Sequence, residues 1–179
     1  MEAVFEMDIF VEHMVKRKKT VMDYLKVLFV LIGGFFIVLV TPFLFVVIPS
    51  IGSLSLAIVV LIVYIMYKLV TSVNLEYEYI LTNSELDVDK IVNLRTRKKM
   101  AEVNFHKIDF FGKISSPEYN KYLKDNSVKK IFACKDIKDA ETFFVVFENN
   151  EGKKMLMFSP SEKMIKSISM INPQKCIVG

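Results

Sequence analysis

The residues best suited to binding a ligand form the basic run Arg95-Thr96-Arg97-Lys98-Lys99, which lies on or beside a predicted hairpin turn. Long cationic side chains at a turn can gather around an anionic lipid headgroup, and each contributes about 1 kcal/mol near a membrane surface. Alternatively, the run is a solvated hairpin whose charges keep a strand edge from pairing with other chains. The candidate lipid-binding residues are therefore Arg95, Arg97, Lys98 and Lys99.

A second group of charged side chains, Glu85, Asp87 and Asp89, alternates with apolar residues. Carboxylates can bind a cation, but the Gly-containing acidic loop of calcium sites does not accompany these three. Alternate residues of a strand point to the same face of a sheet. We therefore interpret the group as the acidic solvent face of a strand, and we expect no metal site.

The remaining reactive side chains are isolated from one another. His13 and His106 have no Cys or Asp at nucleophile or metal spacing, and the chain contains no phosphate-binding Gly loop, GxSxG or HExxH motif. Cys134 and Cys176 lie far apart and outside any CxxC spacing, which is typical of reduced thiols. We expect neither enzyme activity nor a cofactor.

The elements that must position these residues begin with an apolar segment. Residues 27–67 contain no Asp, Glu, Lys, Arg or His. A bilayer core is crossed by about 20 helical residues, so the segment is about twice as long as one span requires. Its one cluster of turn formers, Pro49 to Ser53, falls near the middle. We predict a transmembrane hairpin over 24–73, with helices at about 24–48 and 54–73.

Basic residues set the expected orientation of this hairpin. They flank both spans and are absent from the connecting turn, so both termini should be cytoplasmic in a two-span protein of the cell membrane. The segment has no ionisable residue in the bilayer core, which disfavours a transporter or channel. The topology-setting residues are Lys16, Arg17, Lys18, Lys19, Lys26 and Lys68.

Small residues indicate how the spans pack. Ser53 and Ala57 form a small-xxx-small pair early in the second helix, where the first helix can approach closely. Gly33 and Gly34 lie too deep in the first helix to meet that pair in a simple hairpin. We therefore expect these two glycines to contact another chain.

The segment 1–23 precedes the spans and should be cytoplasmic. Ile9, Phe10, Val11, Met14 and Val15 can share one broad helical face, as in a short helix lying at the membrane interface. The alternative is a loosely ordered tail whose apolar residues touch the C-terminal domain.

After the spans, the hydrophobic period changes to that of strands. Alternation predicts about seven strands within 74–179, at about 75–81, 86–89, 98–104, 107–114, 128–134, 142–148 and 153–158. Residues 115–126 are a long loop or a short helix. A capping Ser159, Pro160 and Glu162 then predict a helix over about 160–171. The fold class is an α+β membrane protein whose small antiparallel β domain is plugged by a C-terminal helix.

This order of elements is that of the pleckstrin-homology (PH) superfold. The first hairpins resemble bacterial PH-like domains through Tyr79-Ile80-Leu81-Thr82-Asn83, Leu86, Val88, Arg95 to Lys99, Val103 and Ile108. The whole chain also resembles an uncharacterised family of two-span membrane proteins of Gram-positive bacteria, through Phe10-Val11-Glu12, Val15-Lys16-Arg17-Lys18-Lys19-Thr20 and Glu76-Tyr77-Glu78-Tyr79. The resemblance implies a PH-like cytosolic domain and no catalytic residues.

Three functions fit these features. The hairpin can tether a PH-like interaction domain that recruits an unidentified protein or forms a homo-oligomer at the lipid bilayer. The domain can instead sense anionic lipid through residues 95–99, or the chain can be an accessory subunit of a membrane transport or enzyme complex. The formal net charge of +4 is too small to indicate a nucleic-acid partner.

Overall fold

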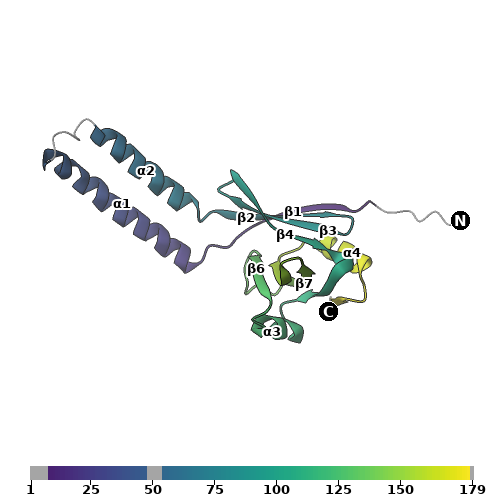
Figure 1. Ribbon diagram of the computed structural model, residues 1–179. Helices are drawn as coiled ribbons and strands as arrows, with labels where there is room; N and C mark the ends of the chain where they lie inside the picture. The colour runs from purple at the N-terminus through teal and green to yellow at the C-terminus, as the bar shows by residue number, and fades with distance from the viewer. Residues whose placement is uncertain (1–7, 48–53, 178–179) are drawn as a thin grey trace. The chain divides into compact units, whose positions relative to one another are not determined.

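A computed structural model describes residues 8–47 and 54–177, and the chain divides into two compact units (Figure 1). One unit is Lys19–Asn74, and the other joins Met1–Lys18 to Leu75–Gly179. The N-terminal segment is therefore part of the β domain, whereas the sequence had predicted a separate segment 1–23. The helical unit is an insertion into that domain.

The helical unit consists of α1 (Val21–Val47) and α2 (Ser55–Thr71). The α1 helix begins at Val21 because Thr20 precedes it as a cap: the Thr20 backbone N–H and hydroxyl both donate to Asp23 Oδ2, at 2.8 and 2.9 Å. The predicted turn at 49–53, including Ser53, lies outside the described residues.

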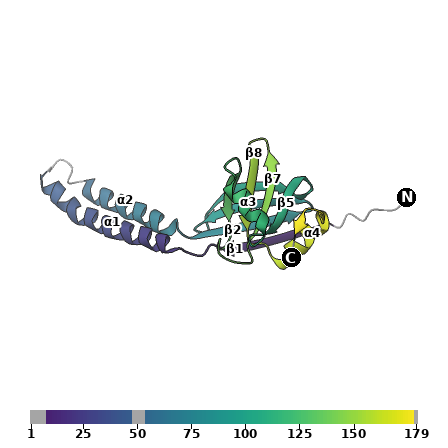
Figure 2. The same cartoon turned by 90° about the horizontal axis from the view of Figure 1, so that it is seen from below.

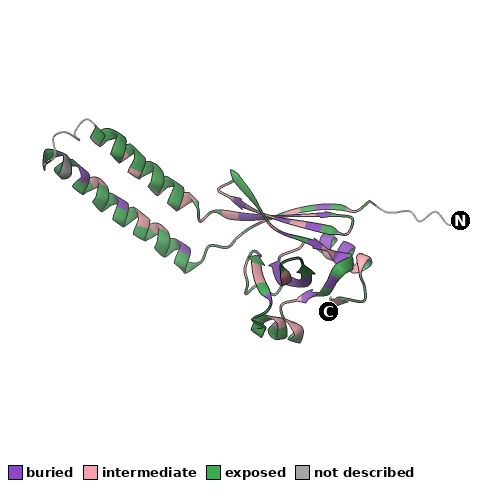
Figure 3. Cartoon of the chain, viewed as in Figure 1, coloured by how far each residue is buried: buried purple, intermediate pink, exposed green. Residues whose placement is uncertain are grey.

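The apolar side chains of both helices are mostly exposed, as the green ribbons of Figure 3 show. Within the described part of the chain, Val21–Phe43 is long and apolar enough to cross a membrane, with a mean hydropathy of 2.4. Leu56–Thr71 is apolar but shorter.

The first sheet of the β domain has the strand order β1-β2-β3-β4, with every pairing antiparallel. Its strands are β1 (Phe10–Lys16), β2 (Leu75–Thr82), β3 (Glu85–Val92) and β4 (Thr96–Asn104). The helix proposed near residues 9–15 was therefore wrong, and so was the loose tail. Val11 and Val15 alternate with Phe10 and Met14, and this segment satisfies its backbone by pairing with β2.

The second sheet has the order β6-β8-β7-β5-β9. Its strands are β5 (Ile108–Lys113), β6 (Lys129–Ala133), β7 (Phe143–Asn149), β8 (Gly152–Phe158) and β9 (Cys176–Ile177). The β6–β8 and β5–β9 pairs are parallel, which corrects the expectation of a purely antiparallel domain. A short helix, α3 (Pro117–Lys124), occupies the segment predicted as a loop or helix.

The core lies between the two sheets and includes the buried side chains of Tyr79, Phe105, Phe111 and Phe158. The Tyr79 hydroxyl donates to the Ala133 carbonyl and accepts from the Ser159 N–H, which connects β2 to the second sheet. The domain closes with α4 (Glu162–Ile171), drawn beside the sheets in Figure 2, and this helix buries Met164 and Ile168.

The N-terminal cap of α4 is Ser161, whose hydroxyl accepts from the Met164 N–H at 3.3 Å. The sequence had predicted Ser159 for this role. The Ser159 hydroxyl instead accepts from the Lys135 N–H. The helix therefore starts at Glu162, two residues later than the capping pattern indicated.

Candidate functional site

One end of the first sheet carries the connections to the helical unit, and we call it the junction end. It is formed by Lys16, Leu75, Val92 and Thr96, because Leu75 lies opposite Val92 and Val92 lies opposite Thr96. The chain leaves this end after Lys16 and returns at Leu75, whose carbonyl accepts from the Arg17 N–H at 2.9 Å. The turn between β3 and β4 therefore lies at the same sheet end as both connections.

The β3–β4 turn has a left-handed backbone conformation at two residues that are not glycine. Asn93 and Leu94 have φ of 52° and 57°, and the Arg95 N–H donates to the Val92 carbonyl at 3.1 Å. The geometry is that of a primed turn, which favours Asn-Gly at its two central positions. A Leu in this left-handed conformation costs about 1 kcal/mol. The Leu94 side chain is nevertheless 75% exposed, so packing within the domain does not compensate for this cost.

The basic run 95–99 is divided between two faces of the sheet. Arg97 Nη2 donates to Glu78 Oε1 at 2.8 Å and lies 2.6 Å from Glu78 Oε2, and Arg97 Nε lies 3.8 Å from Asp89 Oδ2. The Glu78 side chain is only 3% exposed. Lys99 Nζ contacts Asp87 at 2.8 Å and Glu102 at 2.7 Å. Arg97 and Lys99 thus neutralise the acidic face that the sequence predicted for β3.

This pairing raises the pKa of Lys99, chiefly through its hydrogen bond to Asp87 and next through that to Glu102. Arg95 is exposed in the turn, and Lys98 lies opposite Lys90 in the β3–β4 register. Within the described ranges, Arg95, Lys98 and Lys90 form no ion pair. Of the four predicted lipid-binding residues, the structure therefore leaves Arg95 and Lys98 available.

A polar pocket of about 600 Å³ lies next to the end of β1, lined by Lys18, Lys135, Asp136, Lys138 and Asp139. The Lys18 N–H donates to the Lys135 carbonyl at 2.9 Å, and Lys18 Nζ lies 3.3 Å from Asp136 Oδ2. A backbone hydrogen bond from Lys138 and the nearby Lys18 lower the pKa of Asp136. Sequence reasoning missed Lys135 and Lys138, because the fold alone brings their loop to Lys18.

The other predicted topology-setting residues are spread over both units. Lys16 forms an exposed ion pair with Glu76 at 3.4 Å. Arg17 lies close enough to Tyr77 for its charge to oppose the rise in the Tyr77 pKa that burial causes. Exposed positions are occupied by Lys19, Lys26 and Lys68, and the Lys68 ammonium lies 5.1 Å from the Tyr64 ring centroid.

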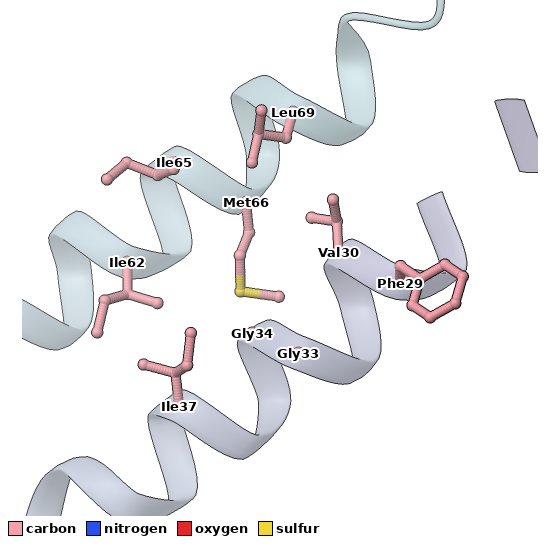
Figure 4. Close-up of a pocket in the computed structure, with 9 residues that line it drawn as sticks. All are labelled: Phe29, Val30, Gly33, Gly34, Ile37, Ile62, Ile65, Met66 and Leu69. Carbon is pink, nitrogen blue, oxygen red and sulfur yellow. The ribbon is translucent and has the colours of Figure 1, made fainter. Parts of the chain in front are cut away.

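The two helices pack through Gly34, where the Met66 side chain of α2 lies against α1 (Figure 4). A Cβ added at Gly34 would meet Met66 Sδ at 2.1 Å, whereas one added at Gly33 would meet nothing within 4 Å. Gly34 thus packs against α2 of its own chain, whereas the contact of Gly33 and Gly34 with another chain stays a prediction. The flexible side chain of Met66 reaches Gly34. The small-xxx-small pattern does not predict this contact. Ala57, the described member of that pair, is exposed.

The His and Cys side chains lie in different segments of residues 8–47 and 54–177. No group of three or more His, Cys, Asp or Glu is placed there to hold a metal ion. His13 packs with its ring centroid 6.1 Å from that of Tyr79, and His106 is exposed. Burial raises the pKa of the Cys134 thiol to about 11, so this free cysteine is a poor nucleophile at neutral pH.

Comparison with known proteins adds a family. No curated protein and no solved structure matches the chain significantly. A family model described as bacterial PH-like domain (DUF6106) matches residues 7–178, which include β1, both helices and all the later strands. This match confirms the PH-like resemblance, and the chain belongs to the bacterial PH-like domain family DUF6106.

Proposed function

We propose that this protein anchors a PH-like interaction domain to the cytoplasmic face of the cell membrane, with α1 and α2 crossing the bilayer as a hairpin. Most apolar side chains of both helices are exposed, and an apolar surface of this size is unfavourable in water. This exposure supports the anchor. In a bilayer, the same surface is in contact with lipid tails.

The pairing of β1 with β2 is the observation that carries this proposal. These strands belong to one folded sheet, and the helical unit is inserted between them. Both ends of the insertion must then lie on the same side of any membrane, so the insertion crosses an even number of times. If α1 spans the bilayer, a second crossing is required, and we assign it to α2, whose 17 residues reach the lower end of the length range of transmembrane helices.

Basic residues support a cytoplasmic location for the domain. Lys16 to Lys19 precede α1, Lys26 lies in its second turn, and Lys68 lies in the last turn of α2. Positive residues in short flanking segments keep those segments in the cytoplasm. The side of the membrane that holds β1 and β2 is therefore expected to be cytoplasmic.

The proposed role of the domain is to recruit a protein partner or to assemble copies of this chain. PH-like folds serve many functions, so the fold supports an interaction role without specifying the partner. The exposed, ion-paired outer face of the first sheet offers a polar surface for such contacts.

Cysteine accessibility tests the anchor. In a variant with Cys134→Ala and Cys176→Ala, single cysteines are introduced as Ser50→Cys and Ser127→Cys, and intact cells are treated with a membrane-impermeant maleimide. We expect labelling at position 50 and none at position 127 until the cells are opened. Labelling at 127 in intact cells would refute the cytoplasmic location, and protection at 50 would refute the crossing of the bilayer by α1.

Purification in mild detergent tests the recruitment role. We expect the protein to elute with a second protein or as an oligomer, because a tethered interaction module acts through bound partners. A strictly monodisperse single chain, also after cross-linking in intact cells, would contradict recruitment and assembly.

A further inference from the structure

We infer that the β3–β4 turn Asn93-Leu94-Arg95 is a membrane contact, in which Leu94 enters the boundary between headgroups and acyl chains while nearby cations bind anionic phospholipid headgroups. This inference rests on the proposed membrane anchor. It concerns Leu94 and the loop after β6, which the basic pattern of the sequence did not single out.

The turn lies at the sheet end from which the chain leaves for α1 and to which it returns from α2. Residues 17–20 connect β1 to α1, and residues 72–74 connect α2 to β2. A residue spans at most about 3.6 Å, so each connection reaches roughly 15 Å at full extension. The turn follows Val92, which pairs directly with Leu75, and neighbouring strands lie about 4.8 Å apart. A bilayer that holds α1 and α2 is therefore within reach of the junction end.

The backbone of Leu94 gives the second step. Asn93 is a residue type that tolerates a positive φ. Leu94, by contrast, is an apolar residue with a Cβ at the position where a primed turn favours Gly. Strained residues are retained where they serve a function. Moving the exposed Leu side chain out of water lowers the free energy. At the tip of a turn beside a bilayer, the Leu94 side chain leaves water by inserting into the membrane interface.

The charges around Leu94 give the third step. Arg97 and Lys99 are held by carboxylates of the domain, whereas Arg95 and Lys98 form no ion pair within the described ranges. In the pocket beside Lys18, Lys135 and Lys138 are likewise without an ion pair among the described residues, while Asp136 pairs with Lys18 and Asp139 accepts a backbone N–H of its own loop. Arg95 and Lys98 therefore remain open to anionic headgroups, in the turn and in the strand that begins at the junction end.

The test uses tryptophan, because the chain contains no Trp and each variant then has a single emitter. Full-length protein is reconstituted into acidic phospholipid vesicles with or without lipids brominated on the upper acyl chain, which quench tryptophan on contact. The test variant is Leu94→Trp. The matched control is Phe10→Trp, also an exposed apolar residue (61%) of the first sheet but at the opposite end of β1. Leu39→Trp, exposed in α1, reports insertion of the helices.

We expect brominated lipid to quench Leu94→Trp severalfold more than Phe10→Trp, with a blue-shifted emission, and to quench Leu39→Trp as well. Adding Arg95→Ser and Lys98→Ser to Leu94→Trp should reduce the quenching in acidic vesicles and leave it unchanged in neutral ones. Quenching of Leu39→Trp without quenching of Leu94→Trp would overturn the inference and keep the anchor. Equal quenching at positions 94 and 10 would also overturn it, and an unquenched Leu39→Trp would overturn the anchor and the inference together.

Discussion

Lys16 and Glu76 are register partners in adjacent strands and form an ion pair of 3.4 Å, although the entire helical unit Lys19–Asn74 separates them in the sequence. The β domain is thus discontinuous, and its first strand is made before the apolar segment. A folded sheet closes the loop that contains the helices, so both connections to the helices start from one end of the sheet.

This discontinuity predicts the outcome of two truncations. Replacing residues 19–74 with a short Gly-Ser turn should leave a folded, soluble domain, because Arg17 N–H and the Leu75 carbonyl are already 2.9 Å apart. A fragment that starts at Leu75 lacks β1 and exposes the surface that Val11 covers, which should lower the free energy of unfolding by at least about 2 kcal/mol. Urea unfolding followed by circular dichroism measures both. Equal stability of the two would show that β1 contributes nothing to the domain.

The divided basic run predicts unequal effects of removing its charges. Arg97→Gln leaves the buried Glu78 carboxylate without its cation and should cost about 2 kcal/mol of stability. Lys98→Gln removes an exposed charge that faces Lys90 and should change stability by less than about 0.5 kcal/mol. Urea midpoints of the full chain in detergent compare them. A similar loss of stability in both variants would mean that the Arg97–Glu78 ion pair contributes no more to the free energy of unfolding than an exposed charge does.

The contact between Gly34 and Met66 predicts that two neighbouring glycines respond differently to the same change. Gly33→Ala adds helix propensity without a clash and should stabilise the helical unit by about 0.5 kcal/mol. Gly34→Ala gains the same propensity, but its Cβ displaces Met66, so the gain should be lost or reversed. Thermal unfolding in detergent, followed at 222 nm, distinguishes them. If both variants are stabilised equally, Met66 does not pack on Gly34.

The raised thiol pKa values predict a loss of stability in alkali. Burial raises the pKa of Cys134 to about 11 from a reference of 9.0, so the folded chain keeps this proton longer than the unfolded chain does. The contribution is complete below pH 9, and it should fall by about 2 kcal/mol as the pH rises to about 11. Urea unfolding across this range should show a shallower decline for Cys134→Ala. An unchanged slope would mean that the thiol ionises equally in both states.

Much of the β domain could be predicted because its signals are local. Seven of the eight described strands after residue 74, β2 to β8, coincide with predicted strands, and only the two-residue β9 has no prediction. Turns such as Asn83 with a φ of 53° and Gly152 with a φ of 102° use the residues that such turns require. The C-terminal helix was likewise indicated by its cap and by apolar residues at helical spacing. Each of these depends on interactions within a few residues.

The features that sequence reasoning missed depend on distant partners. The β1 segment fits a helical face as well as a strand, and only its pairing with β2 decides between them. The division of the basic run depends on an irregularity in the β3–β4 register at Val88 and Asp89, which determines the side chains that Arg97 and Lys99 meet. The pocket at Lys18 requires the loop after β6 to be folded against β1. None of these long-range contacts produces a recognisable pattern among neighbouring residues of the sequence.

Leu94→Gly should separate the stability of the domain from its contact with the membrane. Glycine adopts the positive φ of Leu94 without strain, so the substitution should raise the free energy of unfolding by about 0.5–1 kcal/mol in urea titrations. In the soluble variant that lacks residues 19–74, the same substitution should weaken co-sedimentation with acidic vesicles, because the apolar anchor is removed. A loss of stability would mean that the Leu94 side chain packs on the domain, and it would then be unavailable to lipid. A gain in stability accompanied by weaker binding would mean that the chain retains a costly residue for a contact outside its own fold.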